Sequence, residues 1–192
     1  PPHLSWYQLT IEPNTLFAYR SPKLPDDDEL WDIFEQGHQL LTAAGYRQYE
    51  TSAYAKPGFQ CEHNLNYWRF GDYLAIGCGA HGKLSFSHGG ILRFSKTKHP
   101  KGYLRGEYLY EEKNVPYAER PFEFFMNRFR LLDAVPKREF EAYTGLSQST
   151  VKHQIDLAVE QNYVVENADF WQITEHGKLF LNELLELFLV EE

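Results

Sequence analysis

The feature that most constrains the fold is the order of helical and extended patterns after residue 116. Apolar residues recur at helical spacing in three segments, and the second and third of these have start or stop signals of their own. These segments are 122–132, one that begins at Pro136 and ends at Thr144-Gly145, and one that Ser147 caps. Two short strands, 163–166 and 170–173, and a last helix from Thr174 follow. This order predicts a winged-helix-like domain over residues 116–192.

The charge of this domain argues against DNA as its partner. Its third helix, 147–161, carries Lys152 and His153 against Asp156 and Glu160. Residues 116–192 contain seven Lys or Arg and 14 Asp or Glu, a net charge of −7. Because phosphate contacts dominate the affinity for duplex DNA, a winged-helix regulator is the third choice among the functions considered. We expect no nucleic acid as a partner and interpret the domain as a packing or partner module.

Residues 1–115 have a different pattern, in which extended and helical segments alternate. Strands are predicted over 4–11, 46–54 and 73–76, and a short helix over 64–70. A longer helix begins after a cap in 26–29, stops at Gly45, and is expected to bury Leu30, Ile33, Phe34, Leu40 and Leu41. This alternation is typical of an α/β domain with a parallel sheet, here over residues 1–115. Residues 85–93, around His88, are predicted to form a hairpin.

The run from Gly77 to Gly82 has the G-x-G-x-x-G spacing of a dinucleotide-binding turn. That turn needs a helix directly after the glycines, because the helix N-terminus binds the pyrophosphate. Here Lys83 to Phe86 alternate like a strand, so we reject the dinucleotide turn. Two interpretations stay open: a tight turn at a strand end, and a backbone segment that approaches a ligand closely.

A second candidate site is the segment His63-Asn-Leu-Asn-Tyr-Trp68. On a helix, His63 and Tyr67 are neighbours four residues apart, and so are Asn64 and Trp68. An imidazole, a carboxamide and two large aromatic rings could ligate and sandwich a flat cofactor. The simpler alternative is an amphipathic helix with a satisfied histidine, and the residue chemistry alone favours it.

A third candidate is a local cluster of cations in a chain of net charge −8. The cluster comprises Arg93, Lys96, Lys98, Lys101 and Arg105, with His99 among them. It predicts a surface patch that attracts anions.

The remaining composition indicates the cellular compartment in which the protein functions. No apolar run is long enough for a transmembrane segment, and two cysteines do not suggest a disulfide framework. We therefore expect a cytoplasmic protein. Because the chain opens on Pro1-Pro2 and runs straight into a strand pattern, we expect it to be the C-terminal portion of a longer protein.

Four segments, in this order and spacing, resemble the C-terminal half of the HemW-type haem chaperones of the radical SAM superfamily, also described as oxygen-independent coproporphyrinogen III oxidase-like proteins. They are 49–58, 63–68, 71–82 and 122–131. The resemblance implies the last strands of a partial (β/α) barrel over residues 1 to about 90. It also implies haem as the ligand, transfer to acceptors such as respiratory enzymes, and S-adenosylmethionine with a [4Fe–4S] cluster in the full-length protein. The cluster motif C-x-x-x-C-x-x-C is absent from this chain.

The resemblance also implies roles for individual residues. The family's H-N-x-x-Y-W haem motif falls on His63, Asn64, Tyr67 and Trp68, with His63 as the iron ligand. The side of the cavity that faces S-adenosylmethionine in the related oxidases matches Thr10 and the loop residues Gly77, Gly79, Ala80 and His81. His81 departs from the apolar residue that the oxidases tend to have there.

Our own hypothesis adds Arg93 and Lys96 as cations for the two haem propionates. The alternative function is an oxygen-independent coproporphyrinogen III oxidase, in which the His63 to Trp68 motif is not expected. The sequence leaves a homodimer open.

Overall fold

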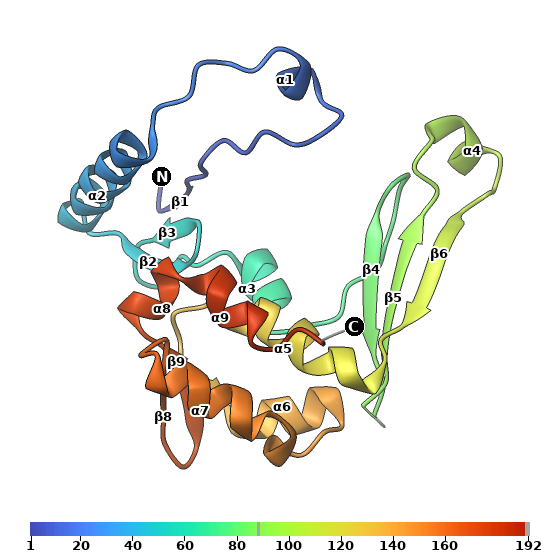
Figure 1. The fold of residues 1–192 in the computed structure, drawn as a ribbon. Helices are drawn as coiled ribbons and strands as arrows, with labels where there is room; N and C mark the ends of the chain where they lie inside the picture. Colours follow the sequence, from blue (N-terminus) through green and yellow to red (C-terminus); the bar gives the residue numbers. More distant parts are fainter. Residues whose placement is uncertain (88, 191–192) are drawn as a thin grey trace. The chain divides into compact units, whose positions relative to one another are not determined.

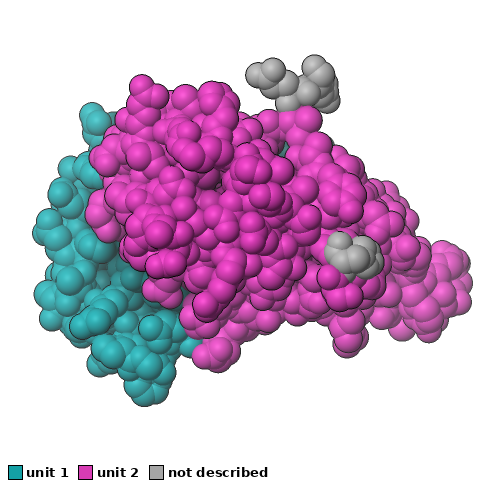
Figure 2. All heavy atoms as spheres, turned by 90° about the horizontal axis from the view of Figure 1, so that it is seen from below, with its two compact units in different colours: residues 1–61 teal, residues 62–192 magenta. Residues whose placement is uncertain are grey.

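The computed structural model describes residues 1–87 and 89–190. By packing, the chain divides into two compact units, residues 1–61 and 62–192 (Figure 2). His88, at the centre of the predicted hairpin, lies outside the described residues. The boundary between residues 115 and 116 rests on sequence pattern rather than on packing, and it stays a prediction.

The first unit contains a three-stranded sheet and two helices. Its elements are β1 (His3–Ser5), α1 (Leu16–Tyr19), α2 (Asp27–Ala43), β2 (Arg47–Glu50) and β3 (Ala53–Ala55). The strand order is β1-β3-β2, and both pairs are antiparallel (Figure 1). The predicted single strand 46–54 is therefore wrong: a turn at Thr51-Ser52 reverses the chain and makes it a hairpin. The expected parallel pairing is wrong here for the same reason, and the first strand is shorter than predicted.

Helix α2 begins as predicted. The Asp26 carboxylate accepts a hydrogen bond from Glu29 N at 2.9 Å, and the Glu29 carboxylate accepts one from Asp26 N at 3.3 Å. This reciprocal capping box satisfies two of the free N–H groups of the first turn.

The expected buried face of α2 is only partly buried. Trp6 stacks on Phe34, with ring centroids 6.3 Å apart, and covers Gly37, where a Cβ atom would lie 1.9 Å from the Trp6 ring. Ile33 and Leu40 are instead 50% and 72% exposed, so the expectation that they are buried is wrong for this chain. Helical spacing shows which residues share a face but does not show what covers that face.

The second unit opens with a helix and an antiparallel sheet. Its first elements are α3 (Glu62–Trp68), β4 (His81–Ser85), β5 (Ile91–Lys96), α4 (Pro100–Leu104) and β6 (Leu109–Asn114). The strands lie in the order β4-β5-β6, and α4 connects β5 to β6 (Figure 1). The predicted strand 73–76 is reduced to one bridge between Tyr73 and Lys83, and Leu74 and Ile76 are exposed. Strand β4 begins at His81, within the glycine run, which confirms that no helix begins there.

The winged-helix order predicted for the C-terminal residues is confirmed. The elements are the 3-10 helices Tyr117–Glu119 and Gln148–Val151, α5 (Arg120–Arg128), β7 (Val135–Pro136), α6 (Lys137–Thr144), α7 (Lys152–Glu160), β8 (Val164–Glu166), β9 (Phe170–Ile173), α8 (Glu175–Leu179) and α9 (Leu181–Glu186). Helix α6 ends at Gly145, whose φ of 69° suits glycine. Strand β7 adds a third strand to the predicted wing, in the order β7-β9-β8.

One aromatic core joins the two ends of this unit. Phe125 of α5 is fully buried and stacks on Phe129 and Phe140. Phe70, which follows α3, is also fully buried and lies 5.5 Å from Phe124 and 5.6 Å from Tyr143, measured between ring centroids. Residues outside the winged-helix pattern are therefore part of its core.

The turn between β4 and β5 lies against the end of α6. Gly89 has a φ of 79°, and a Cβ atom built on it would lie 2.5 Å from Gly145 Cα. No residue with a side chain fits this approach without a backbone shift.

Replacing Gly89 with alanine should therefore lower the free energy of unfolding of residues 62–192 by about 2 kcal/mol, from left-handed strain and a backbone clash together. The matched control is Gly106→Ala, because Gly106 has a φ of 94° but no neighbour within 4 Å of its added Cβ. The control should cost about 1 kcal/mol from strain alone. Hydrogen exchange of peptides from this unit, measured in urea on the full-length protein, gives the loss of stability for each variant. Equal losses for Gly89→Ala and Gly106→Ala would contradict the close contact between Gly89 and Gly145.

Candidate functional site

Helix α3 carries the residues predicted to bind haem. Leu65 is 7% exposed and anchors the helix, while His63 is exposed. The His63 and Tyr67 rings meet edge to face with centroids 4.7 Å apart, and Tyr67 lies 4.3 Å from Tyr73 by the same measure. The predicted helical neighbours His63 and Tyr67 therefore do touch, and Tyr73 extends the aromatic row.

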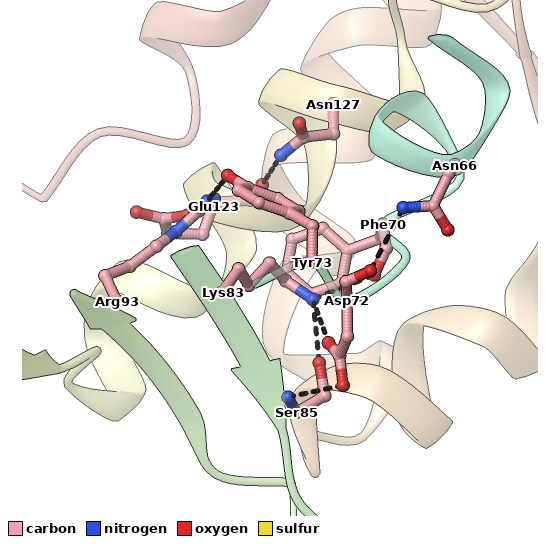
Figure 3. Close-up of polar contacts among 9 residues, drawn as sticks. All are labelled: Asn66, Phe70, Asp72, Tyr73, Lys83, Ser85, Arg93, Glu123 and Asn127. Atoms are coloured by element: carbon pink, nitrogen blue, oxygen red, sulfur yellow. Dashed lines mark hydrogen bonds and ion pairs between the residues drawn. The ribbon is translucent and has the colours of Figure 1, made fainter. Parts of the chain in front are cut away.

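The C-terminal end of α3 is fixed by a strained residue. Phe70 has a φ of 64°, a conformation that a bulky L-residue rarely adopts. Its ring is fully buried, and Gly71 N donates to Asn66 O at 2.7 Å. The ammonium of Lys83 donates to Phe70 O at 2.8 Å (Figure 3). The same ammonium lies 3.9 Å from the centroid of the Phe70 ring. Core packing and Lys83 together stabilise Phe70 as the cap that ends α3, although the positive φ of Phe70 is unfavourable for a bulky residue.

Lys83 is a buried cation that the sequence analysis did not single out. It is 1% exposed, and its Nζ also donates to Asp72 Oδ1 at 3.0 Å and to Ser85 Oγ at 2.7 Å (Figure 3). Burial lowers the pKa of Lys83, against the opposing effect of Asp72. Burial also acts to raise the pKa of Asp72, but hydrogen bonds from Ser85 and Lys83 outweigh it and hold that pKa below its ordinary value. The pair ties the segment after α3 to strand β4.

A second polar group holds Tyr73 in place. Arg93 Nη1 donates to Tyr73 Oη at 2.8 Å, while its Nε and Nη2 donate to Glu123 Oε2 at 3.0 Å and 2.5 Å (Figure 3). Burial raises the pKa of Tyr73, which keeps its hydroxyl protonated, although Arg93 acts in the opposite direction. The strand β5 and the helix α5 are thereby linked to the aromatic row of α3.

A cavity of about 370 Å³ lies beside this group. It is lined by Tyr73, Arg93, Glu123 and His81, and by Lys113 and Glu111 of β6 among others. The structure thus brings together His81, expected from the glycine loop, and Arg93, expected from the cation cluster.

The glycine loop is a tight turn held at both sides. Gly77 has a φ of 101° and its N–H donates to Tyr103 Oη at 3.0 Å, while Gly79, with a φ of 70°, donates to Thr97 O at 3.0 Å. Ala80 O accepts from Lys96 N at 2.8 Å, and His81, which is exposed, begins β4. Thr10, by contrast, belongs to the first unit, where it is exposed between β1 and α1.

Part of the predicted cation cluster is neutralised within the chain. Arg93 is paired with Glu123, and Arg105 Nη2 lies 3.3 Å from Glu107 Oε1. The ammonium of Lys96 lies 5.4 Å from the centroid of the Phe94 ring. The cation that lies opposite Arg93 on the neighbouring strand is Lys113, which the sequence did not indicate.

The described residues do not contain a ligand set for an iron–sulfur cluster. Within 1–87 and 89–190 there is no group of three or more His, Cys, Asp or Glu side chains that could hold a metal ion. Cys61 and Cys78 are free thiols. No helix in the same ranges combines the length and apolar character needed to cross a membrane.

Several residues that shape the site escaped sequence reasoning. Asp72 and Lys83 are 11 positions apart, and Arg93 and Glu123 are 30 apart, so no helical or strand period connects them. Asp72 and Glu123 lie in segments that resemble the family, 71–82 and 122–131, and this was the signal available for them. Lys83 lies outside these segments, and Arg93 was indicated only as a member of the cation cluster.

A family model described as the HemN C-terminal domain matches residues 115–180. Over all of its 192 residues the chain is 86% identical to a Haemophilus influenzae protein named Heme chaperone HemW, and it covers 50% of that protein. It is 71% identical over 191 residues to the Escherichia coli protein of the same name, again covering 50%. The chain spans about half the length of the curated relatives it matches.

Among solved structures, the chain is similar to the coproporphyrinogen III oxidase (HemN) of Escherichia coli, described as a radical SAM enzyme. The TM-score is 0.72 over 98% of this chain and 48% of that chain, at 16% identity. At this identity the likeness concerns the fold alone, and it confirms the α/β fold class. The identities of 86% and 71% to the named relatives, over the whole length of this chain, show that the chain belongs to the HemW family.

Proposed function

We propose that the full-length protein binds haem and passes it to acceptor proteins, respiratory enzymes among them. The names of the relatives that are 86% and 71% identical support this proposal. The single observation that carries it is the exposed imidazole of His63 beside Tyr67, on a helix whose end is fixed by the buried Lys83. An accessible nitrogen donor on a rigid aromatic support is what an axial haem ligand requires.

In this proposal the residues of α3 have separate roles. His63 ligates the iron, Tyr67 provides an aromatic wall, and Asn64 contributes a polar side chain beside it. Trp68 is half-buried, its indole N–H has no hydrogen-bond partner among the described residues, and the Arg130 guanidinium lies 4.9 Å from its ring centroid. In this proposal Trp68 packs behind Tyr67, and its indole N–H can donate a hydrogen bond to a bound water or ligand.

S-adenosylmethionine and a [4Fe–4S] cluster belong to the proposal for the full-length protein. The residues of this chain proposed for the S-adenosylmethionine side are Thr10, Gly77, Gly79, Ala80 and His81. Because the described residues offer no cluster ligands, no step of the proposed function is assigned to the cluster in this chain. A cytoplasmic location and an open possibility of a homodimer remain part of the proposal.

Replacing His63 with alanine should weaken haem binding by the full-length protein about tenfold or more and change the position of the Soret band, because the axial nitrogen is lost. Haem titrations followed by absorption measure both effects. The matched control is His153→Ala, an exposed histidine of α7, which should leave them unchanged. Coproporphyrinogen turnover by wild-type protein without haem uptake would overturn the proposal in favour of the oxidase.

A further inference from the structure

We propose that the cavity beside Tyr73 binds the carboxylate groups of the haem cargo, with Arg93 and Lys113 as the two cations. This inference rests on the proposed function and specifies where the acidic edge of the ligand lies. It replaces Lys96 with Lys113 in the propionate hypothesis that the sequence suggested.

The floor of the cavity follows from the strand register. Arg93 of β5 lies opposite Lys113 of β6, and the next row on the same face pairs Ser95 with His81 and with Glu111. Both rows line the cavity. Lys96 does not line it. The face that Arg93 shares with Lys113 and His81 therefore presents nitrogen donors from three different strands.

The cavity is also next to the proposed haem helix. Tyr73 is the shared wall, because its ring contacts Tyr67 while its hydroxyl accepts the hydrogen bond of Arg93. Tyr67 in turn contacts His63. A porphyrin held at its iron by His63 and lying along the two tyrosines would direct one edge toward Arg93.

Arg93 already binds a carboxylate in the geometry that a propionate would use. Its hydrogen bonds to Glu123 and Tyr73 account for three of the five N–H groups that a guanidinium carries. The Arg93 and Glu123 side chains are 26% and 20% exposed, so a ligand can reach both. Glu123 therefore competes with the ligand for Arg93. Its carboxylate fixes the orientation of the Arg93 guanidinium, and a propionate must either bind the guanidinium beside Glu123 or replace Glu123 as its partner.

This arrangement predicts opposite effects for the two partners. Arg93→Gln should weaken haem binding by the full-length protein about 10- to 100-fold, because a charge-assisted hydrogen bond is lost. Glu123→Gln should strengthen haem binding several-fold, because it removes the competing carboxylate and its repulsion of the ligand. Lys113→Gln should weaken haem binding less than Arg93→Gln, since Lys113 is exposed and paired with Glu119 at 2.8 Å.

The test compares haem with its dimethyl ester, in which both carboxylates are blocked, in the same detergent solution. The three variants should bind the ester as wild type does, and Lys98→Gln, a charge change at an exposed residue outside the cavity lining, should affect neither ligand. If Arg93→Gln and Glu123→Gln each weakened the binding of haem and of its dimethyl ester by the same factor, the pair would only support Tyr73. That result would overturn the carboxylate site but not the proposed function. Wild-type protein that binds neither ligand would overturn the proposed function as well.

Discussion

Replacing Phe125 with alanine should lower the free energy of unfolding of residues 62–192 by about 4 kcal/mol. Phe125 is fully buried and lies within 5.6 Å, between ring centroids, of five aromatic rings. These rings are Phe124, Phe129, Phe140, Trp171 and Phe188. They come from α5, α6, β9 and the end of the chain, so no single element can close the cavity that alanine would leave.

Hydrogen exchange of peptides from this unit, measured in the full-length protein at increasing urea, gives the loss. The control is Phe180→Ala, because Phe180 is 39% exposed and water can fill the vacated space. Its cost should be less than half of that at Phe125. Similar losses at the two positions would show that the ring cluster is not the main core of the unit.

Replacing Lys83 with methionine should cost about 3 kcal/mol, at the low end of the range for removing one partner of a buried ion pair. Methionine keeps most of the buried stem but leaves Phe70 O and Ser85 Oγ without the donor they now have. The cost stays at the low end because the Asp72 side chain is 41% exposed and can be hydrated. The same exchange measurement applies, with the largest local loss expected in α3, whose end Lys83 holds.

Lys152→Met is the matched control for this substitution. Lys152 pairs with Asp156 on α7, and both side chains are more than half exposed. Exposed ion pairs contribute little to stability, so this variant should unfold like wild type. A Lys83→Met protein as stable as the control would mean that the ammonium is not needed for the cap at Phe70.

The Asp72–Lys83 pair should also weaken in acid. The pKa of Asp72 is lower in the folded chain than its ordinary value, so its carboxylate stabilises the fold fully above the unfolded pKa of about 3.9. That stabilisation is lost as the pH falls through the lower folded pKa. The stability difference between wild type and Asp72→Asn should therefore be present at pH 7 and shrink in the range below about pH 4.

A loss of stability in the Lys83→Met variant would also support the haem proposal, because Lys83 fixes the end of the helix that carries His63. The strained cap at Phe70 sets where α3 ends, and α3 carries His63 and Tyr67. A bulky residue with positive φ persists only when its surroundings compensate for the strain, and here a buried cation and the aromatic core do so. Haem affinity and the stability of this cap should then change together across variants of Lys83.

Local signals in the sequence determined part of the elements and their order. The caps at Asp26 and Ser147, the stop at Gly145 and the period of apolar residues were enough to predict α2 and the order of the winged-helix elements, except for strand β7. The strand after the glycine run was predicted for the same reason. These features depend on residues within a few positions of one another, which is the range over which capping and periodicity act.

Only the tertiary structure decided which residues meet. Antiparallel pairing in the first unit depends on a two-residue turn at Thr51-Ser52 that leaves the apolar pattern unchanged. The pairing of Lys83 with Asp72 and of Arg93 with Glu123 depends on segments that packing brings together. Because packing gives these charges their partners, no count of charges along the chain could show which cations stay available to a ligand.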